Sequence, residues 1–378
     1  MIHRQRLIFY SQHLVGVGHH FRNRQIIRAL AGEYDVYFLD GGRPVPGATL
    51  PASVQTYHLT PVFKDLTTGR LTSETGWDIQ TVLKARKQTL ISLINRICPD
   101  IFIIEYFPFA RWELAGELLS AICEARSINP DIRIICSLRD VPRRTQDADR
   151  VYSILNHHFN ALLIHADPQL TRLEDHFPHT NNIHIPIHYT GYVVEPLDRI
   201  GREFCKQNIV LVSAGGGADG YDLIKPCIKA WQCLFQKGVI KDRKMVIFTG
   251  PFMPQAQYAA LESMCKDGPF QLDRFTSHFL QWMQMADLSI SRAGYNTCMN
   301  ILETRTRAIL IPGTLVSDQK FRAKKMATLG LAECIVSGRL NPFCLAESIQ
   351  RGLSKEPLNH NVSLNGAEET RRYLGSFK

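Results

Sequence analysis

The most constraining feature of the sequence is a pattern of short apolar strand, glycine-containing loop and helix that occurs near the N-terminus and again after the midpoint. The first copy joins an apolar strand at residues 6–10 to a helical pattern at 21–30. The second begins with a strand at 208–212, continues through three glycines at 215–217 and enters a helix at 221–237. Parallel strands need crossover helices between them, so the repetition predicts an α/β protein with two Rossmann-like parallel-sheet domains facing a central cleft.

Other segments of strand length extend both alternations. They are apolar or rich in β-favouring residues, and they lie at 34–39, 54–59, 100–105, 133–137, 161–164, 183–189, 244–248, 270–274 and 308–311, with a further short strand that starts at 288. Further helical patterns occupy 79–98 and 364–373. Charged or aromatic residues directly follow many of the strands, so we expect one rim of each sheet to carry the functional groups.

The length of the chain agrees with two domains. A chain of 378 residues exceeds the usual size of one domain, and 45% hydrophobic with 21% charged residues is typical of a globular protein. We expect an N-terminal domain over residues 1–192, a C-terminal domain over 200–360, and a final helix within 361–378 that packs back on the N-terminal domain. Residues 190–199 read as the linker.

Cysteine usage and hydropathy indicate the compartment. The ten cysteines include no Cys-x-x-Cys pair and lie mostly in apolar segments, so they read as reduced core residues. The apolar run near the N-terminus, residues 7–10, is too short for a signal-peptide core. No segment reaches the roughly 18 consecutive apolar residues of a transmembrane helix. We therefore expect a cytoplasmic protein.

The net charge of +9 indicates an acidic partner, which could be a phosphorylated ligand, a nucleic acid or an anionic membrane surface. The basic residues are scattered, and no zinc-finger or RNP-type motif accompanies them, so we expect no nucleic-acid partner. Peripheral association with a membrane stays open. No sequence feature indicates an oligomeric state.

The stretch 288–322 is the strongest local candidate for a ligand site. It reads as a strand, a turn at Gly294, a helix, a second strand and a polar loop containing Asp318 and Gln319. A helix that begins after a tight glycine turn directs unpaired N–H groups and partial positive charge outward, which suits a phosphate. The alternative is an ordinary strand–helix–strand unit with a capped helix.

Two glycine-containing loops are further candidates. Gly215, Gly216 and Gly217 lie between a strand and a helix, where a missing Cβ permits close approach to a phosphate or sugar. No Gly-Lys-Ser/Thr follows, so the segment is not a Walker A loop; the alternative is a plain tight turn. His19 follows Gly18 after the first strand, and a histidine can accept a proton at neutral pH. A hydrogen-bonded loop histidine is the alternative.

Three other polar groups have weaker claims. Glu105 and Arg111 flank an aromatic segment and could line an acceptor pocket, or could form a salt bridge that caps the following helix. The Asp-x-Asp pattern at 147–149 lies in a charged helical stretch, and we read it as structural. The pair at 157–158, two histidines, has no third ligand at metal spacing, so we expect no metal site.

Three motifs in order resemble the GT-B glycosyltransferases of family 28. They are Gly-Val-Gly-His at 16–19, Ser-Ala-Gly-Gly-Gly-Ala-Asp-Gly at 213–220 and Ser-Arg-Ala-Gly-Tyr-Asn-Thr at 291–297. That family includes the N-acetylglucosaminyltransferase that makes the lipid-linked peptidoglycan precursor. The resemblance implies the GT-B fold for the two Rossmann-like domains.

The chain also resembles, along nearly its whole length, a group of uncharacterised predicted glycosyltransferases. The matching motifs are Glu-Tyr-Phe-Pro-Phe-Ala-Arg at 105–111, Leu-Arg-Asp at 138–140, Thr-Gly-Pro-Phe-Met-Pro at 249–254 and Gly-Tyr-Asn-Thr at 294–297. Each motif alone is weak, but their order and strand positions make the set specific for the fold and fairly specific for sugar-nucleotide chemistry.

The resemblance implies a nucleotide-diphosphate sugar, UDP-linked, held mainly by the C-terminal domain. Phe275 and Thr276 would face the nucleobase, the two glycine turns would hold the diphosphate, and Asp318 and Gln319 would face the donor sugar. Matched position by position, the donor-binding residues are Gly215, Gly216, Gly217, Phe275, Thr276, Arg292, Gly294, Tyr295, Asn296, Thr297, Asn300, Asp318 and Gln319.

The resemblance also implies how transfer occurs. His19 matches the histidine proposed as base, and an unidentified acceptor would be held mainly by the N-terminal domain. The residues expected on the acceptor side are Gly16, Gly18, Glu105, Arg111 and Asp167. Such enzymes invert the anomeric centre without an obligatory metal, so no cofactor is expected, while helix N-termini stabilise the leaving diphosphate.

Two positions depart from the family pattern. The glutamate that commonly accepts hydrogen bonds from the ribose hydroxyls is replaced by Asn300, an uncharged amide. The arginine that the peptidoglycan enzyme carries near the interdomain glycine has no counterpart near residues 191–193. Two alternatives therefore stay open: a sugar-nucleotide hydrolase or 2-epimerase on the same scaffold, and a catalytically silent sugar-nucleotide-binding protein.

Overall fold

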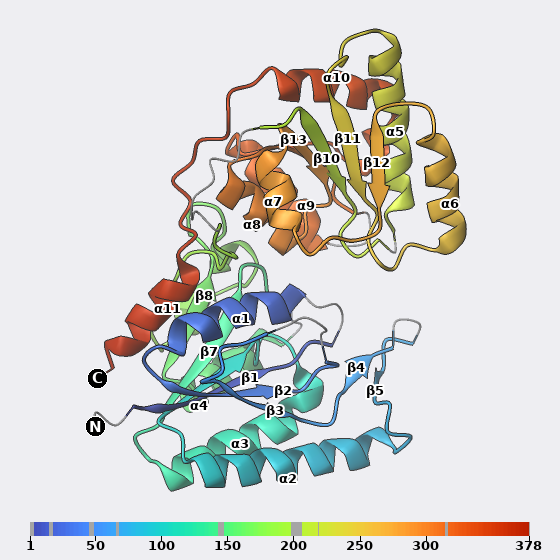
Figure 1. Ribbon diagram of the computed structural model, residues 1–378. Coiled ribbons are helices and arrows are strands. Elements are labelled where there is room, and N and C mark those ends of the chain that lie inside the picture. Colours follow the sequence, from blue (N-terminus) through green and yellow to red (C-terminus); the bar gives the residue numbers. More distant parts are fainter. Residues whose placement is uncertain are drawn as a thin grey trace. The chain divides into compact units, whose positions relative to one another are not determined.

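A computed structural model describes residues 4–14, 18–44, 49–65, 68–142, 147–197, 206–217, 219–313 and 317–377, with only the backbone described at 19–21, 317 and 337. The chain forms two compact units (Figure 1). The N-terminal unit comprises Met1–Val193 and Ser363–Lys378, and the C-terminal unit comprises Val194–Val362.

The N-terminal unit is built on a parallel sheet of seven strands, in the order β3-β2-β1-β6-β7-β8-β9. In chain order these strands are β1 (Arg6–Ser11), β2 (Asp35–Asp40), β3 (Gln55–His58), β6 (Ile101–Glu105), β7 (Arg133–Arg139), β8 (Ala161–His165) and β9 (Ile187–Tyr189). The central strands β6 and β8 are buried at every position, which explains their continuous apolar runs. The order reverses between β1 and β6, so loops diverge at that point of the carboxyl edge.

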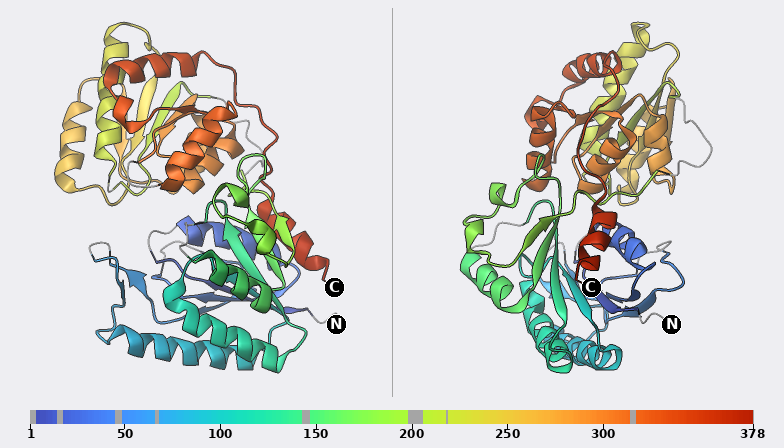
Figure 2. Two further views of the ribbon diagram at one scale, coloured as in Figure 1. Left: turned by 180° about the vertical axis from the view of Figure 1, so that it is seen from behind. Right: turned by 90° about the vertical axis from the view of Figure 1, so that its left-hand side faces the viewer.

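Helices cover both faces of this sheet (Figures 1 and 2). They are α1 (Gly18–Leu30), α2 (Ile79–Ile97), α3 (Ala115–Ile128), α4 (Ala148–His158) and α11 (Gly366–Gly375). The pair α1 and α11 packs together on one face, and the pair α2 and α3 on the other. Helix α2 begins where Asp78 accepts hydrogen bonds from the N–H groups of Gln80 and Thr81, and it ends at Cys98 in a left-handed conformation.

Two details of this unit differ from the sequence expectations. The structure contains a short antiparallel hairpin of β4 (Phe63–Lys64) and β5 (Leu71–Thr72), which is not among the strands expected from the sequence. The strand expected at 183–189 is shorter, because residues Thr180–Asn182 form a 3₁₀ turn and pairing with β8 starts at Ile187.

The C-terminal unit contains a parallel sheet of six strands, in the order β12-β11-β10-β13-β14-β15. The strands are β10 (Ile209–Ser213), β11 (Lys244–Phe248), β12 (Phe270–Asp273), β13 (Leu288–Ser291), β14 (Arg307–Leu310) and β15 (Glu333–Cys334). The helices are α5 (Tyr221–Gln236), α6 (Gln255–Met264), α7 (Phe279–Met285), α8 (Tyr295–Thr304), α9 (Ser317–Thr328) and α10 (Pro342–Leu353). Helix α5 packs on α6 and α10, and α7 packs on α8.

The C-terminal segment returns to the N-terminal unit and joins its core. The backbone N–H of Tyr192 donates to the Ser363 carbonyl, and Val193 forms an antiparallel bridge with Asn365. A Cβ on Gly366 would lie 2.4 Å from the Gly191 carbonyl oxygen, so only glycine permits this approach. Leu374 of α11 is fully buried in the cluster formed by β1, β2, β6 and α1.

In both sheets the strand order reverses at one point, between β1 and β6 in the N-terminal unit and between β10 and β13 in the C-terminal unit.

Candidate functional site

The strand order of the C-terminal unit reverses between β10 and β13, and two loops leave the carboxyl edge there in opposite directions. One is the glycine loop that begins at Ala214, and the other is the turn 292–294 that leads into α8. Open parallel sheets bind ligands at such a switch point because the diverging loops leave a crevice. The two glycine turns that were predicted from the sequence, at 215–217 and at Gly294, therefore follow neighbouring strands at the same edge of the sheet.

The three glycines of the first loop have different roles. Gly215 and Gly217 both have positive φ, at 65° and 91°. A Cβ on Gly217 would lie 2.3 Å from the Thr249 carbonyl oxygen, and one on Gly250 would lie 2.4 Å from the Gly215 carbonyl oxygen. The loops after β10 and β11 therefore pack backbone against backbone. A Cβ on Gly215, in contrast, would meet no heavy atom of the described residues within 4 Å.

Helix α8 starts at the second turn without a side-chain cap. Its N-cap residue is Gly294, which has φ −65° and ψ 151° and no side chain to bond the first N–H groups of the helix. Asn296 and Thr297 in the first turn are partly exposed, and Tyr295 is buried. The start of α8 thus provides the positive end of a helix dipole at the switch point.

Two arginines, Arg292 partly buried and Arg322 buried, hold these loops in place. Arg292 donates to the carbonyl oxygens of Asp219 at 2.9 Å and Ile311 at 3.2 Å. Arg322 of α9, which is 1% exposed, donates to the Ala293 carbonyl at 2.7 Å. The bonds connect the segments that follow β10, β13 and β14, so both guanidinium groups fix the loops. Each also has a carboxylate partner, Asp219 at 3.9 Å from Arg292 and Asp318 at 3.3 Å from Arg322.

The sequence expectation of a polar loop around Asp318 was wrong. Asp318 and Gln319 lie in the first turn of helix α9, which begins at Ser317. Asp318 pairs with Arg322 one turn later at 3.3 Å, and Gln319 accepts a hydrogen bond from the Gly313 N–H at 3.0 Å. The helix forms because these i,i+4 and loop-to-helix bonds satisfy polar groups that the sequence pattern left unassigned.

The remaining donor candidates lie on the same edge or on α8. Phe275 follows β12 and is 69% exposed. The Thr276 hydroxyl accepts a hydrogen bond from the His278 N–H. Asn300 lies in the second turn of α8 with a half-buried side chain, and Glu303 accepts a hydrogen bond from the Leu197 N–H at 3.4 Å. Glu303 therefore contacts the segment that enters this unit.

At the carboxyl edge of the N-terminal sheet, Glu105 is enclosed by partners. It is 1% exposed and forms a 2.6 Å ion pair with Arg22 of α1. Ser11 at the end of β1 donates to it at 3.5 Å, and Asn23 donates to Ser11 at 2.8 Å. Glu105 thus takes part in a buried salt bridge with Arg22, and its predicted pairing with Arg111 stays a prediction. The acceptor-side role of Glu105 stays a prediction.

Sequence reasoning missed several buried polar residues of the same unit. His165 at the end of β8 is fully buried, with its ring nitrogens 2.8 Å from the Ser137 hydroxyl and 2.9 Å from the Thr190 hydroxyl. Burial, together with the positive charge of Arg22, lowers the pKa of His165 well below its usual value. The sequence places this histidine directly after an expected strand but does not identify its partners, which lie on β7 and just after β9.

A second missed network lies near α2 and α3. Arg86 is 1% exposed and donates to both carboxylate oxygens of Glu117, at 2.7 and 3.0 Å. The same guanidinium donates to Gln12 at 2.9 Å and to the Tyr10 hydroxyl at 3.0 Å. Burial and the nearby Glu117 carboxylate raise the pKa of Tyr10. The network holds the end of β1 to both helices.

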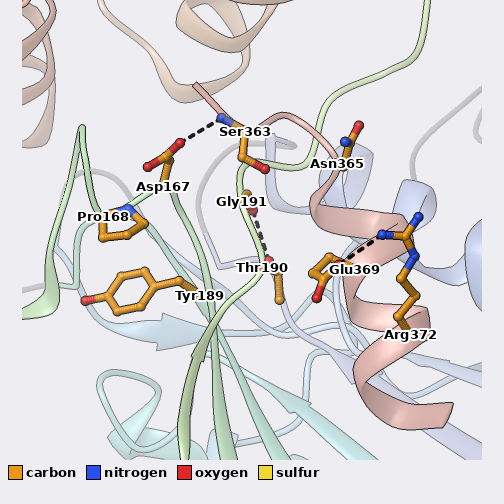
Figure 3. Close-up of a pocket in the computed structure, with 9 residues that line it drawn as sticks. All are labelled: Asp167, Pro168, Tyr189, Thr190, Gly191, Ser363, Asn365, Glu369 and Arg372. Atoms are coloured by element: carbon orange, nitrogen blue, oxygen red, sulfur yellow. Dashed lines mark hydrogen bonds and ion pairs between the residues drawn. The ribbon is translucent and has the colours of Figure 1, made fainter. Parts of the chain in front are cut away.

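Asp167 lines a pocket of ≈ 230 Å³ at the carboxyl ends of β8 and β9 (Figure 3). Its lining residues are Asp167, Pro168, Tyr189, Thr190, Gly191, Ser363, Asn365, Glu369 and Arg372. The carboxylate accepts hydrogen bonds from the Ser363 N–H at 2.7 Å and from the Gln169 N–H at 2.8 Å. Asp167 therefore fastens the returning C-terminal segment to the loop after β8.

The other predicted positions are partly outside the description. Gly16 lies outside the described residues, Gly18 is the first residue of α1, and His19 is described by its backbone alone as the second residue of that helix. Arg111 has φ 71° at the start of a 3₁₀ turn, and its guanidinium lies 5.6 Å from the centre of the Tyr106 ring. Asp147 accepts a hydrogen bond from the Arg150 N–H as the N-cap of α4, which gives it a structural role.

Comparison with known proteins agrees with this architecture. Residues 210–372 match the glycosyltransferase family 28 C-terminal domain. A UDP-N-acetylglucosamine–N-acetylmuramyl-(pentapeptide) pyrophosphoryl-undecaprenol N-acetylglucosamine transferase of Crocosphaera subtropica is 25% identical over 177 residues, which are 46% of this chain and 46% of the relative. The chain thus matches about half the length of this curated relative.

Solved structures with the same fold cover nearly the whole chain. The glycotransferase of kitacinnamycin has a TM-score of 0.63 at 14% identity and covers 99% of this chain and 96% of its own. Acinetobacter baumannii MurG has a TM-score of 0.57 at 14% identity, with coverage of 97% and 95%. Phytolacca americana UGT2, complexed with UDP-2-fluoroglucose and pterostilbene, has a TM-score of 0.61 at 15% identity, with coverage of 100% and 95%. The likeness confirms the predicted fold class, with parallel sheets in two Rossmann-like units.

Proposed function

We propose that this chain, a family 28-like protein with the GT-B fold, is an inverting glycosyltransferase that moves a sugar from a nucleotide-diphosphate sugar to a hydroxyl acceptor. The observation that carries the proposal is the open carboxyl edge of the C-terminal sheet. There the positive-φ Gly215 and the start of α8 meet at the strand-order switch point. The curated relative, whose name specifies a UDP-sugar, supports UDP as the nucleotide.

The donor diphosphate would bind between the glycine loop and the first turn of α8. Backbone N–H groups of 215–217 and 294–297 supply donors that carry no side-chain bulk. The guanidinium groups of Arg292 and Arg322 hold these loops through carbonyl oxygens and are themselves paired with Asp219 and Asp318, so the start of α8 would supply the main positive potential for a dianionic ligand. The same backbone N–H groups stabilise the negative charge that develops on the leaving diphosphate, so the reaction would need no metal.

Transfer would use one base on the N-terminal unit. His19 takes the proton of the acceptor hydroxyl, whose oxygen attacks the anomeric carbon as the bond to the diphosphate oxygen breaks. Attack from the face opposite the leaving group inverts the anomeric centre. A histidine is suited to this step because its neutral imidazole can accept a proton near neutral pH.

A silent sugar-nucleotide-binding protein is the second candidate, and Asn300 is the observation that favours it. The half-buried amide on α8 can accept a hydrogen bond from a ribose hydroxyl, but it lacks the charge of a carboxylate. If the hydrogen bond between Asn300 and the ribose shortens in the transition state, replacing a carboxylate by an amide would slow turnover more than it weakens nucleotide binding. Hydrolysis or 2-epimerisation at the same donor site is the third reading.

We further propose that the protein works in the cytoplasm and associates peripherally with anionic membranes through its net charge of +9. Among the described residues, no helix has the length and apolarity to cross a bilayer. Sedimentation with anionic vesicles should be strong at low salt and lost at high salt. Absence of binding at low salt contradicts the membrane proposal without affecting the catalytic one.

Incubation with nucleotide sugars tests the proposed function. Thermal shift with UDP, dTDP, GDP and ADP first identifies the nucleotide that stabilises the full chain. Release of that nucleotide from its sugar only when an acceptor is added supports transfer, whereas release in water supports hydrolysis. Binding without turnover under either condition supports the silent protein. Absence of stabilisation by any nucleotide contradicts the donor site itself.

A further inference from the structure

The pocket at the carboxyl ends of β8 and β9 is formed by three segments that are far apart in the sequence (Figure 3). The loop after β8 provides Asp167 and Pro168, the end of β9 provides residues 189–191, and the returning C-terminal segment provides Ser363, Asn365 and two residues of α11. Ser363 is the first residue of the N-terminal unit after the chain returns from the C-terminal unit. All lining residues of this pocket therefore belong to the N-terminal unit.

Main-chain hydrogen bonds hold the three segments around the pocket. The Gly191 N–H donates to the Ala166 carbonyl at 3.1 Å, and the Tyr192 N–H donates to the Ser363 carbonyl at 2.8 Å. The Ser363 N–H donates to the Asp167 carboxylate at 2.7 Å. Gly191 has φ 80°, and a Cβ there would lie 2.3 Å from the Ser363 hydroxyl oxygen. The frame of the pocket is thus main chain, whose position does not depend on side-chain rotamers.

The two sides of the pocket differ in chemistry. The rings of Pro168 and Tyr189 lie on one side, next to Asp167, whereas Glu369 and Arg372 of α11 lie on the other side (Figure 3). A tyrosine presents an apolar body with a polar tip, and a proline ring is apolar. One side of the pocket therefore offers apolar surface, and the opposite side offers both hydrogen-bond donors and acceptors.

The charged groups of the pocket already have partners in the protein. Glu369 forms an ion pair with Arg372 at 3.4 Å, and Asp167 accepts two backbone N–H bonds. An ionic ligand would compete with these bonds. A neutral hydroxyl can add to them instead, because a carboxylate has about four lone-pair sites and a guanidinium has five N–H donors. The chemistry of the pocket thus suits a neutral ligand with several hydroxyl groups.

The volume of the pocket limits the ligand to about one ring. It is ≈ 230 Å³, which is below the roughly 300–1,000 Å³ of sites for drug-sized ligands. A pyranose has apolar C–H faces and a rim of hydroxyl groups, each of which donates and accepts hydrogen bonds. A single sugar ring therefore matches the pocket in size, in charge and in the contrast between its two sides.

The pocket is separate from the proposed base. His19 is the second residue of α1, which follows β1, and β8 is the third strand from β1 in the sheet. Three strand spacings of about 4.8 Å place the end of β8 roughly 14 Å from the end of β1. A sugar in this pocket would therefore not be the one whose hydroxyl reacts.

We propose that this pocket is a second saccharide site, which holds one neutral sugar ring that does not react. The proposal goes beyond the function proposed above and does not depend on it, because the donor site lies in the other unit. Two sources share this chemistry, a free monosaccharide and a non-reacting unit of a longer glycan. The ring contacts both the segment that leaves the N-terminal unit and the segment that returns to it. Its binding should therefore slow hydrogen exchange at 190–192 and 363–366.

Saturation-transfer NMR of the full chain with methyl glycosides tests the site. The methyl glycosides of glucose, galactose, mannose and N-acetylglucosamine each present one neutral ring without a phosphate. At least one should bind with a dissociation constant on the order of 1–10 mM. Arg372→Ala should weaken this binding about tenfold, as expected for one lost hydrogen bond from a charged donor, and Asn365→Ala should weaken it less. Arg351→Ala is the matched control, because Arg351 is a 55% exposed arginine that pairs with Glu333 in the other unit.

Repeating the titration with UDP separates this site from the donor site. Unchanged glycoside affinity at saturating UDP supports the second site, whereas loss of glycoside binding places the sugar in the donor site and overturns it. A chain that binds the glycoside but not UDP keeps this site and overturns the donor site alone. Absence of binding for all four glycosides, or equal binding by Arg372→Ala and the wild-type chain, overturns the second site and leaves the donor site untouched.

A trisaccharide built from the glycoside that binds best distinguishes the two sources. Tighter binding of the trisaccharide supports the site as one that holds a unit of a longer glycan. Equal binding supports it as a site for a free monosaccharide. Complete exclusion of the trisaccharide together with unchanged exchange at 190–192 and 363–366 in the bound state would contradict the assignment of the glycoside to this pocket.

Discussion

The carboxyl edges of the two parallel sheets have opposite chemistry. In the N-terminal unit, polar and charged groups at strand ends are buried and bonded to protein partners, as in the pairs Glu105–Arg22 and His165–Ser137. In the C-terminal unit, the edge presents Gly215, an uncapped helix start and an exposed Phe252. The same Rossmann-like architecture therefore ends in a network of buried hydrogen bonds in the N-terminal unit, which we call the closed edge. In the C-terminal unit it ends in glycine backbone, a helix start and an exposed ring, which we call the open edge.

This difference shows which strand-end residues are evidence for a ligand. A charged side chain after a buried strand reads as functional from sequence, yet Glu105 and Asp167 both have protein partners that account for them. A helix start without a side-chain cap, on the same sheet edge as an exposed aromatic ring, has no such structural account, because burying the ring would be favourable. We therefore place the donor site on the open edge and attribute the closed edge mainly to stability.

The largest expected effect is on turnover, because the proposed base and the proposed donor site lie in different units. His19→Ala should reduce turnover roughly 10²- to 10⁴-fold by removing the base, while nucleotide affinity stays within about twofold because the donor site is in the other unit. Steady-state kinetics and calorimetry on the same preparation measure both quantities. Unchanged turnover would remove His19 from the mechanism, and a parallel loss of nucleotide affinity would assign His19 to donor binding and not to proton transfer.

Breaking the closed edge should affect stability more than binding. Glu105→Ala leaves the buried Arg22 without its anion and should lower the free energy of unfolding by roughly 3–5 kcal/mol. The double variant Glu105→Leu with Arg22→Met should be much closer to wild type, since no charge is left buried. Chemical denaturation provides both values. A stable Glu105→Ala variant with abolished transfer would instead support the acceptor-side role predicted from sequence.

Two glycines of the open edge should differ although they are neighbours. Gly217→Ala places a Cβ 2.3 Å from the Thr249 carbonyl oxygen and should displace the loop, so nucleotide binding should fall more than about tenfold. Gly215→Ala meets no described atom and should cost only about 1–2 kcal/mol of backbone strain. Calorimetry with UDP and thermal unfolding compare the two variants. Equal effects of both substitutions would contradict the assignment of distinct roles.

The closed edge should also give a pH signature. Burial lowers the pKa of His165 well below that of an unfolded histidine, and Arg22 and Glu105 are the charged groups that act on it. Below about pH 6.5 the unfolded chain therefore binds a proton that the native chain does not. As the pH is lowered further, the free energy of unfolding should decrease by up to about 1.4 kcal/mol per pH unit. His165→Gln should reduce this slope in denaturation curves between pH 5 and 7. Parallel curves for both proteins would show that His165 titrates normally in the native state.

Much of the fold followed from local sequence. The strand at 244–248 was predicted at its observed bounds, because a glycine-containing turn follows this short segment directly and limits where the strand can end. The two glycine turns were also found in advance, since a helix that follows them has few other ways to begin. Their proximity follows from strand order alone, once β10 and β13 are neighbours.

The rest depended on contacts between distant residues. Glu105 is bonded to a residue 83 positions earlier, and nothing in either segment specifies that pairing. The helical state of Asp318 depends on Arg322 and on a bond from Gln319 to the preceding loop. Phe252 was part of a motif that had no assigned role, because its closeness to Gly216 appears only when the loops after β10 and β11 are packed together.

Hydrogen–deuterium exchange of the full chain, with and without saturating UDP, tests the contrast between the two edges most directly. We predict slower exchange at 213–217, 249–253 and 292–297, where backbone N–H groups and the Phe252 loop would meet the nucleotide. The strand ends around Glu105 and His165 should exchange at the same rate in both conditions. Protection confined to the N-terminal edge, or absent from all of these segments at saturation, would contradict the donor site proposed for the C-terminal unit.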